Sequence, residues 1–356
     1  MISAEEACQK PIFTVLSGPA ASAIGGIKLG KVDNTLVVDI GGTTTDIALI
    51  KDGRVRISKE GAMVSGARLR VPSVDTMTVS LGGNTGIFAS RNSVFLGRKA
   101  VKPICLAPDA YNVMKDRSYL YSSKYGDVGI TPTDYFCAEA DSGYGNQKIA
   151  QKALYALADE AGMKYEDPCE SIRWQICSRL LRSMLSHIVG TEIQEDGEGE
   201  IAVMGNDIVR PSFSLEIPVV GIGAPTKYFF DIIRDRIDGK FTIPEHYDVG
   251  NAVGAVCSSV YYKKQISIKA EKDQNGTESN SLIYYLITDK GRMTFGTKEE
   301  AITYGQSYAQ KVVEQYMYRN HVQKFSTRSN VEDVIFTIAD EKVYTETKIT
   351  AIAEVV

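Results

Sequence analysis

Asp-Ile-Gly-Gly-Thr-Thr-Thr-Asp, residues 39–46, follows directly on the apolar run Leu36–Val38. The adjacent glycines Gly41 and Gly42 allow a sharp turn in which main-chain N–H groups face an anion. The threonines add hydroxyl donors without adding charge, and an aspartate at a strand end suits a magnesium ion. The segment therefore predicts a strand and a phosphate-binding loop, with an ordinary tight hairpin as the alternative.

Three other segments rich in small residues accompany this loop along the chain. SGPAASAIGG begins at Ser17 and precedes the loop, whereas GIGAPTKYFF from Gly221 and DVGNAVGAV from Asp248 follow it. Ser17 and the nearby proline are typical of a helix start, and residues 11–16 before them predict a short apolar strand. Glycines in these segments let the main chain approach a ligand or a neighbouring helix closely.

The remaining sequence predicts a mixture of strands and helices. We expect strands over 35–58 and 61–102, helices over about 146–162 and 168–190, and a strand, glycine turn and helix over 216–237, with Phe229, Ile233 and Ile237 on one helix face. The segment 105–145 is rich in Tyr, Ser and Asp and predicts loops and short elements. This alternation indicates an α/β fold.

The sequence predicts two domains, 1–263, with an insertion near 103–145, and a small α+β domain over 264–356. In the second domain, a polar segment, AEKDQNGTESN, separates apolar strands. A helix follows, opened by the capping box Thr297 and Glu300. We expect its apolar face to consist of Ala301, Tyr304, Tyr308 and Val312, and the strands VIFTIAD and KITAIAEVV to complete the domain.

Composition excludes several classes of partner. The net charge of -4 offers no basic surface for nucleic acid, and no run of roughly 18 apolar residues predicts a membrane span. The six cysteines contain no C-x-x-C pair, so we expect thiols in a reducing cytoplasm rather than a zinc or redox site. The three histidines, His187, His246 and His321, lack metal-ligand spacing, and we expect surface or core positions for them.

The order of the four small-residue segments resembles the second lobe of the actin-like ATPases, a ribonuclease H-like fold with a mixed sheet flanked by helices. Within that superfamily, the sequences of these motifs are most similar to those of the A-type subunits of the hydantoinase/5-oxoprolinase family. The resemblance rests on TVLSGPAASAIGG, VVDIGGTTTDIALIKDGR, DTMTVSLGGN, DVGITPTDYF and the capped helix of the tail. It implies a cytoplasmic, ATP- and Mg²⁺-dependent hydrolase that phosphorylates a cyclic amide or related carbonyl, usually beside a B-type subunit.

The resemblance also assigns roles to individual residues. Catalysis falls to Asp39 and Asp46, with Asp39 also serving the metal. Phosphate and nucleotide contacts fall to Gly41, Gly42, Thr43, Thr44, Thr45, Gly221, Gly223 and Ala224. Gly82 and Gly83 are candidates for the substrate side, with an ordinary turn as the alternative.

Members of the family normally carry a first lobe with its own D-x-G-G-T loop, which this sequence lacks. We therefore expect a fragment, a split gene product or one partner of a two-chain site. A non-catalytic actin-like nucleotide-binding module and an inactive remnant are the alternative functions, because the same loop serves several chemistries.

Two further aspartates have alternative interpretations. Asp134 is expected to cap a helix. Asp75 is either a general base or, as we favour, a partly exposed carboxylate at a strand end.

Overall fold

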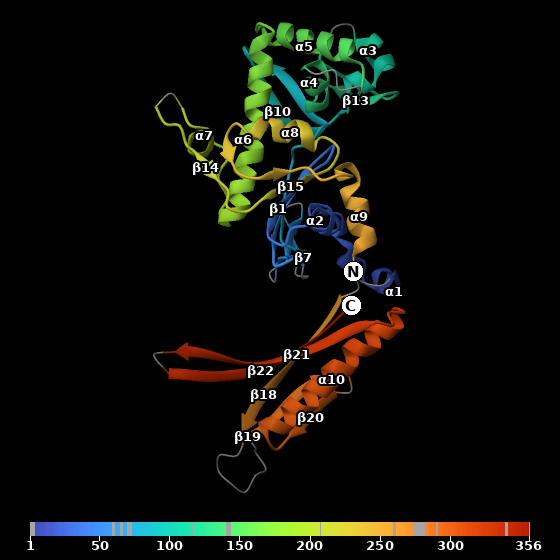
Figure 1. The fold of residues 1–356 in the computed structure, drawn as a ribbon, viewed down its shortest axis with the longest axis vertical. Helices are drawn as coiled ribbons and strands as arrows, with labels where there is room; N and C mark the ends of the chain where they lie inside the picture. Colours follow the sequence, from blue (N-terminus) through green and yellow to red (C-terminus); the bar gives the residue numbers. More distant parts are fainter. Residues whose placement is uncertain are drawn as a thin grey trace. The chain divides into compact units, whose positions relative to one another are not determined.

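The computed structural model describes residues 4–58, 61–64, 67–69, 73–114, 117–139, 144–206, 208–258, 261–272, 282–289, 291–338 and 341–355. The chain forms two compact units (Figure 1). The larger is Leu16–Cys257, and the smaller joins Met1–Val15 to Ser258–Val356.

The larger unit is built on a mixed six-stranded sheet in the order β17-β15-β1-β2-β3, with β8 also paired to β2. Its strands are β1 (Thr35–Ile40), β2 (Thr45–Lys51), β3 (Arg54–Val55), β8 (Thr76–Val79), β15 (Val219–Ile222) and β17 (Phe241–Thr242). Strand β15 is parallel to β1 and β17, whereas β2 is antiparallel to its neighbours. The strand-turn-strand prediction for residues 35–55 and the α/β fold are thus confirmed.

Helices cover this sheet and extend the unit (Figure 1). They are α2 (Ser17–Gly30), α3 (Pro108–Met114), α4 (Pro132–Glu139), α5 (Gln147–Ala161), α6 (Glu166–Val189), α7 (Gly197–Met204), α8 (Thr226–Ile233) and α9 (Gly250–Cys257), with the 3-10 helices η2 (Ile104–Leu106) and η3 (Tyr247–Val249). The two long helices predicted near 146–162 and 168–190 are confirmed as α5 and α6.

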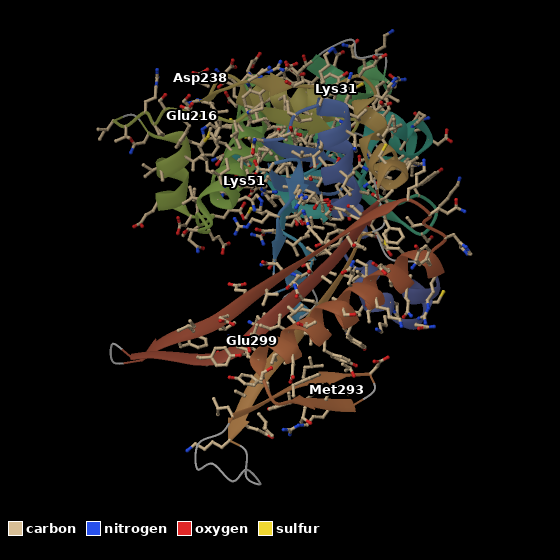
Figure 2. The ribbon with its side chains drawn as sticks, turned by 60° about the horizontal axis from the view of Figure 1, so that its bottom comes forward. Lys31, Lys51, Glu216, Asp238, Met293 and Glu299 are labelled. Atoms are coloured by element: carbon tan, nitrogen blue, oxygen red, sulfur yellow. The ribbon has the colours of Figure 1, made fainter. Side chains whose placement is uncertain are left out.

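Short strands make up the rest of the unit. They are β4 (Ile57–Ser58), β5 (Ala62–Val64), β6 (Ala67–Leu69), β7 (Ser73–Val74), β9 (Thr85–Ser90), β10 (Ser93–Ala100), β11 (Lys102–Pro103), β12 (Tyr119–Ser122), β13 (Gly126–Gly129), β14 (Phe213–Ser214) and β16 (Ile237–Asp238). Asp238 of β16 and Glu216, just after β14, lie next to each other, and Lys31 and Lys51 mark the ends of α2 and β2 (Figure 2).

Glycines set how closely α2 packs. A Cβ atom at Gly26 would lie 2.4 Å from a methyl of Val37 on β1, and one at Gly25 would lie 1.9 Å from the carbonyl oxygen of Gly250. The two small-residue helices, α2 and α9, therefore pack main chain against main chain, as the composition of both segments predicts.

The smaller unit contains a five-stranded antiparallel sheet, β20-β19-β18-β22-β21, packed against one long helix (Figure 1). Its elements are α1 (Ala4–Gln9), η1 (Pro11–Thr14), β18 (Tyr261–Lys272), β19 (Leu282–Thr288), β20 (Gly291–Phe295), α10 (Lys298–Arg319), β21 (Phe325–Ile338) and β22 (Glu341–Val355). Figure 2 shows Met293 on β20 and Glu299 in the first turn of α10. Thr297 caps α10 as predicted, because its Oγ1 accepts a hydrogen bond from the Glu300 amide at 3.2 Å.

Three local predictions differ from the structure. Residues 11–14 form a 3-10 helix rather than a strand, with Pro11 in its first turn and no main-chain N–H of its own to give to a sheet. Helix α8 ends at Ile233, so Ile237 lies on β16 instead of the helix face. The polar segment 270–280 lies mostly outside the described residues.

The buried face of α10 is also shifted from the prediction. It consists of Ala301, Gly305, Ala309, Val313 and Met317, spaced four apart, while the predicted Tyr304, Tyr308 and Val312 are only half-buried. Small side chains let the helix lie close to the sheet, since a Cβ atom at Gly305 would be 2.5 Å from Ile349. The larger tyrosines flank this contact.

Candidate functional site

The loop between β1 and β2 is a tight turn with unused donors. Asp39 faces Asp46 across the antiparallel pair, and the Gly41 amide closes the turn by donating to the Thr44 carbonyl at 2.9 Å. Within the described residues, the amides of Gly42, Thr43 and Thr44 donate to no protein acceptor. Gly42 and Thr43 are exposed, so these N–H groups can receive an anion.

A second glycine turn, Leu81–Asn84, supports the first from behind. The amides of Gly83 and Asn84 donate to the carbonyls of Gly41 and Gly42 at 3.0 and 2.6 Å. A Cβ atom at Gly82 would lie 2.6 Å from both carbonyl oxygens. The carbonyls of the phosphate loop are thus fixed by this turn, and Gly82 is buried where main chain meets main chain.

Asp39 is held by the two small-residue helices. Ser22 Oγ on α2 donates a hydrogen bond to Asp39 Oδ2, and Asn251 Nδ2 on α9 donates to Ser22 Oγ at 2.8 Å. The same amide group of Asn251 also donates to the Gly18 carbonyl at 3.1 Å. The sequence indicated that these helices matter, but it did not single out Ser22 or Asn251.

Burial raises the pKa of both loop carboxyls. For Asp39 the hydrogen bond from Ser22 opposes this effect only in part. For Asp46 burial also comes first; the hydrogen bond from Thr78 Oγ1, at 2.5 Å, works against it, and the nearby Asp39 charge adds to it. Two adjacent half-buried carboxylates favour a cation between them and the phosphates of a ligand.

The turn between β15 and α8 reaches the same carboxylate. Gly223 has a φ of +91°, and its amide donates to the Tyr247 carbonyl at 2.7 Å. A Cβ atom there would lie 2.7 Å from Asp39 Oδ1 and 2.2 Å from the Ile40 carbonyl oxygen. Both the conformation and the space at this position therefore require glycine.

An aromatic cavity of about 460 Å³ opens beside the loop. Gly42 and Gly83 of the two glycine turns line it, as do Ala224 and Pro225 of the turn between β15 and α8. Its remaining lining includes Thr133, Phe136, Cys137, Tyr144, Tyr228, Tyr247 and Asp248. The rings of Phe136 and Tyr228 are stacked, with centroids 5.2 Å apart and an interplanar angle of 24°. A planar, partly apolar group fits such walls.

Comparisons with known proteins show similarity in sequence and in fold. Residues 1–116 match the model of the hydantoinase/oxoprolinase family. In this part, the chain is similar to the hydantoinase/oxoprolinase family. Over 80 residues the chain is 32% identical to caprolactamase subunit alpha of Pseudomonas jessenii, an alignment that covers 22% of this chain and 11% of that protein.

Two solved structures share the fold. The nucleotide-free acetone carboxylase aligns with a TM-score of 0.57 and 15% identity, over 95% of this chain and 49% of that one. The ATP-dependent caprolactamase of Pseudomonas jessenii aligns with a TM-score of 0.50 and 17% identity, over 94% and 48%. The chain thus spans about half the length of these solved structures.

The structure separates the predicted site residues into two groups. Gly41, Gly42, Thr43 and Thr44 form the loop; Asp39, Asp46, Gly223, Gly83 and Ala224 border it or the cavity. In contrast, the Thr45 hydroxyl is buried and donates to the Leu81 carbonyl at 2.7 Å. Gly221 lies beneath α8, where a Cβ atom would be 2.5 Å from the Phe230 ring.

The aromatic residues of the cavity were not singled out from the sequence. Phe136 stands in the segment DVGITPTDYF, which carried the family resemblance, and Tyr228 stands in GIGAPTKYFF. The position of these two aromatic residues inside the motifs was therefore the one feature of the sequence that could have indicated their role. Nothing in the sequence indicated that α4 and α8 meet.

The carboxylates of the loop fit a magnesium ion held mainly by phosphate and water. Among the described residues, no group of three or more His, Cys, Asp or Glu side chains could hold a metal by itself. Mg²⁺ commonly takes only one or two protein carboxylates beside substrate phosphates. The pair Asp39 and Asp46 meets that requirement.

The other candidates from the sequence have structural roles. Asp134 is buried and is the third residue of α4. It forms a capping box with Thr131: its carboxylate accepts a hydrogen bond from the Thr131 amide at 2.9 Å, and its own amide donates to Thr131 Oγ1 at 3.4 Å. It also accepts the Cys105 amide at 2.7 Å, and burial raises its pKa. Asp75 pairs with Arg56 at 2.8 Å.

The histidines are dispersed. His187 is half-buried on α6, whereas His246 and His321 are exposed in turns, each with a positive φ. In the part of the chain that the structure describes, no helix combines the length and apolar character that crossing a membrane would take.

Proposed function

We propose that this chain binds ATP at the Asp39–Asp46 loop and works as part of an ATP-dependent hydrolase that acts on a cyclic amide or related carbonyl. The observation that carries the proposal is the open loop, with free amides at Gly42–Thr44, directly beside the aromatic cavity. The match of residues 1–116 to the model of the hydantoinase/oxoprolinase family supports the reaction class.

The geometry favours one orientation of the nucleotide. The phosphates would lie against the Gly42–Thr44 amides, which are donors without a protein acceptor among the described residues. The base would enter the aromatic cavity between Ala224 and the stacked pair Phe136 and Tyr228. Asp39 and Asp46 would then hold Mg²⁺, which offsets phosphate charge when it is bound.

The proposed chemistry is transfer of the terminal phosphoryl group. The carbonyl oxygen of the substrate bonds to the γ-phosphorus while the bond to the β-phosphate oxygen breaks, and ADP leaves. Water then adds to the activated carbon, and the C–N bond of the amide breaks as the nitrogen takes up a proton, which leaves an acyl phosphate. A second water attacks the acyl carbon, and inorganic phosphate leaves as the carboxylate forms. Donors fixed before the reaction, such as the loop amides, stabilise the negative charge on the transferring group.

A partner is part of the proposal. One relative is named as an alpha subunit, and the chain spans about half the length of the solved structures. We infer that a further lobe closes over the phosphates and that a B-type subunit completes hydrolysis. We also propose a cytoplasmic location for the enzyme, in keeping with its similarity to the hydantoinase/oxoprolinase family.

Calorimetric titration with ATP, with and without Mg²⁺, tests nucleotide binding. Gly42→Ala adds a methyl to the exposed loop, only 3.0 Å from the movable end of Asn84, so we expect the fold to persist. We expect ATP affinity to fall at least about tenfold, because the methyl occupies the space of the phosphate. Gly18→Ala, where a Cβ atom meets nothing within 4 Å, is the matched control.

The titration also distinguishes the alternatives. Absence of heat from ATP, both for the chain alone and with the completing lobe or B-type partner added, contradicts the proposal. ATP hydrolysis that increases with a cyclic amide supports the enzyme. Nucleotide-dependent assembly without any effect of the amide would instead support a non-catalytic actin-like module.

A further inference from the structure

Two adjoining cavities lie on the larger unit beside α6. They share no lining residue with the aromatic cavity. Each has a volume of about 300 Å³, and they share Arg179, Arg182 and Glu195. Thr78 and Arg98 also line the first cavity. The polar lining and the size suit a small charged molecule.

Three arginines converge on one carboxylate in these cavities. The Glu195 carboxylate forms ion pairs with the guanidinium groups of Arg98 at 2.6 Å, Arg179 at 3.2 Å and Arg182 at 2.9 Å. Two other acidic residues line the cavities, Glu192 and Asp196, both on the exposed segment that carries Glu195. Beneath that segment, Arg179 and Arg182 are only 13% and 9% exposed.

The two buried arginines differ in their hydrogen bonds. Arg179 donates to the carbonyls of Ser80, Gly97 and Leu96, which explains its burial. Arg182 donates to Glu195 alone among the described residues, although a guanidinium carries five N–H donors. A buried cation with so few acceptors is costly unless another anion approaches it.

A second unsatisfied group stands next to Arg182. Ser178 Oγ is buried, has no hydrogen-bond partner among the described residues, and belongs to a residue that lines the second cavity. Ser178 and Arg182 are four residues apart on α6, so their side chains are neighbours on one helix face. A hydroxyl and a guanidinium on one face form a donor set for carboxylate or phosphate.

We propose that these cavities bind a small anion with carboxylate or phosphate groups, which displaces Glu195 from Arg182. Arg182 and Ser178 contact the ligand directly, and the exposed Arg98 closes over it. Glu195 occupies the place of one anionic group in the ligand-free chain. The site adjoins Thr78, whose hydroxyl donates to Asp46, but anion binding here does not depend on the proposed ATP site.

The test is calorimetry at low ionic strength on the full chain with two separate probes, inorganic phosphate and succinate. Glu195→Gln removes the internal competitor, so we expect affinity for the preferred probe to rise about tenfold. Arg182→Gln should abolish binding, and Ser178→Ala should weaken it severalfold. Arg234→Gln, an exposed arginine paired with Asp231, should change nothing.

Two controls distinguish anion binding in these cavities from binding at the phosphate loop and from a loss of folding. Phosphate binding that persists in Gly42→Ala but is lost in Arg182→Gln assigns the anion to these cavities. If Arg182→Gln melts early, Arg98→Ala replaces it, because Arg98 is 75% exposed and its loss should also weaken binding. The proposal is overturned if neither probe binds to wild type or Glu195→Gln, or if Glu195→Gln lowers the melting temperature without a gain in affinity.

Discussion

At the scale of single residues, the central feature is the carboxyl group of Asp39, whose ionised form is unfavourable in the ligand-free fold. Asp39 lies at the end of β1, opposite Asp46, with Ser22 and Asn251 behind it. Burial outweighs the stabilising hydrogen bond, so its pKa is raised. Such a group destabilises the unliganded protein and becomes favourable when a cation binds.

Asp39→Asn should therefore stabilise the unliganded chain at neutral pH. Since the native pKa is raised, the ionised carboxyl favours the unfolded state, and wild-type stability falls as pH rises through the raised native pKa. The asparagine variant lacks this loss and can still accept from Ser22. A gain of about 1 kcal/mol would raise Tm by roughly 2–4 °C in a unit of this size.

Differential scanning calorimetry between pH 4 and 8 measures this effect. The difference in Tm should be largest at pH 7–8 and shrink as the solution becomes acidic, and Mg²⁺-ATP should stabilise wild type more than the variant. Asp238→Asn on β16 is the exposed control. A difference in Tm that stays constant with pH, or a variant less stable than wild type, would show that the Asp39 charge does not destabilise the folded state.

At the scale of elements, the crossing of α2 and α9 determines how the site is held. A Cβ atom at Gly254 would lie 1.7 Å from the Ala21 carbonyl oxygen and 2.6 Å from the Gly25 nitrogen. These are main-chain atoms in helices, so they cannot move away from an added methyl group as the end of a flexible side chain can. The crossing thus depends on glycine in both helices, and it brings Asn251 to Ser22.

Gly254→Ala is expected to destabilise the larger unit by about 2 kcal/mol or more, since an added methyl in a packed contact forces the backbone apart. Urea unfolding followed by circular dichroism gives the free energy of unfolding. Gly18→Ala on α2 meets open space and should be neutral or slightly stabilising. Equal stability of the two variants would refute the close crossing.

The sequence predicted the local part of the site and missed the part built by packing. The loop, its two aspartates and the glycine turns follow from motifs within a few residues of each other, such as residues 39–46. The stacking of Phe136 on Tyr228 joins α4 to α8, elements far apart in the chain. No local pattern specifies such a contact, because it depends on how whole elements pack.

The same reasoning explains the errors in secondary structure. The run at 11–14 has strand-like apolar residues, but it forms a short 3-10 helix. Ile237 continues the spacing of Phe229 and Ile233, yet it pairs with Phe213 on β14. At Ile237 the apolar spacing is real but the tertiary environment decides the element, whereas at 11–14 Pro11 has no main-chain N–H to give to a sheet.

At the scale of the whole molecule, each of the two units has a core of its own. Ile266, Leu286 and Ile349 are fully or almost fully buried within the smaller unit, packed against α10. The larger unit has separate clusters on the two faces of its sheet. Independent cores imply that damage to one unit leaves the other able to fold.

Ile349→Ala should lower the stability of the smaller unit by about 2–5 kcal/mol, because it opens a cavity under Gly305 of α10. Thermal unfolding should then show an earlier transition for this unit, while the ATP titration stays as in wild type. Ile287→Ala removes an isoleucine that is 70% exposed and is the control. Loss of ATP binding in Ile349→Ala alone would mean that the units are not independent.

The pairing of α2 with α9 has a consequence for communication along the chain. The larger unit begins at Leu16 and ends at Cys257, so its two covalent connections to the smaller unit emerge from the start of α2 and the end of α9. Ser22 on α2 donates directly to Asp39, and Asn251 on α9 donates in turn to Ser22. A ligand that binds Asp39 therefore contacts the hydrogen-bond chain that joins the two helices from which both connections leave.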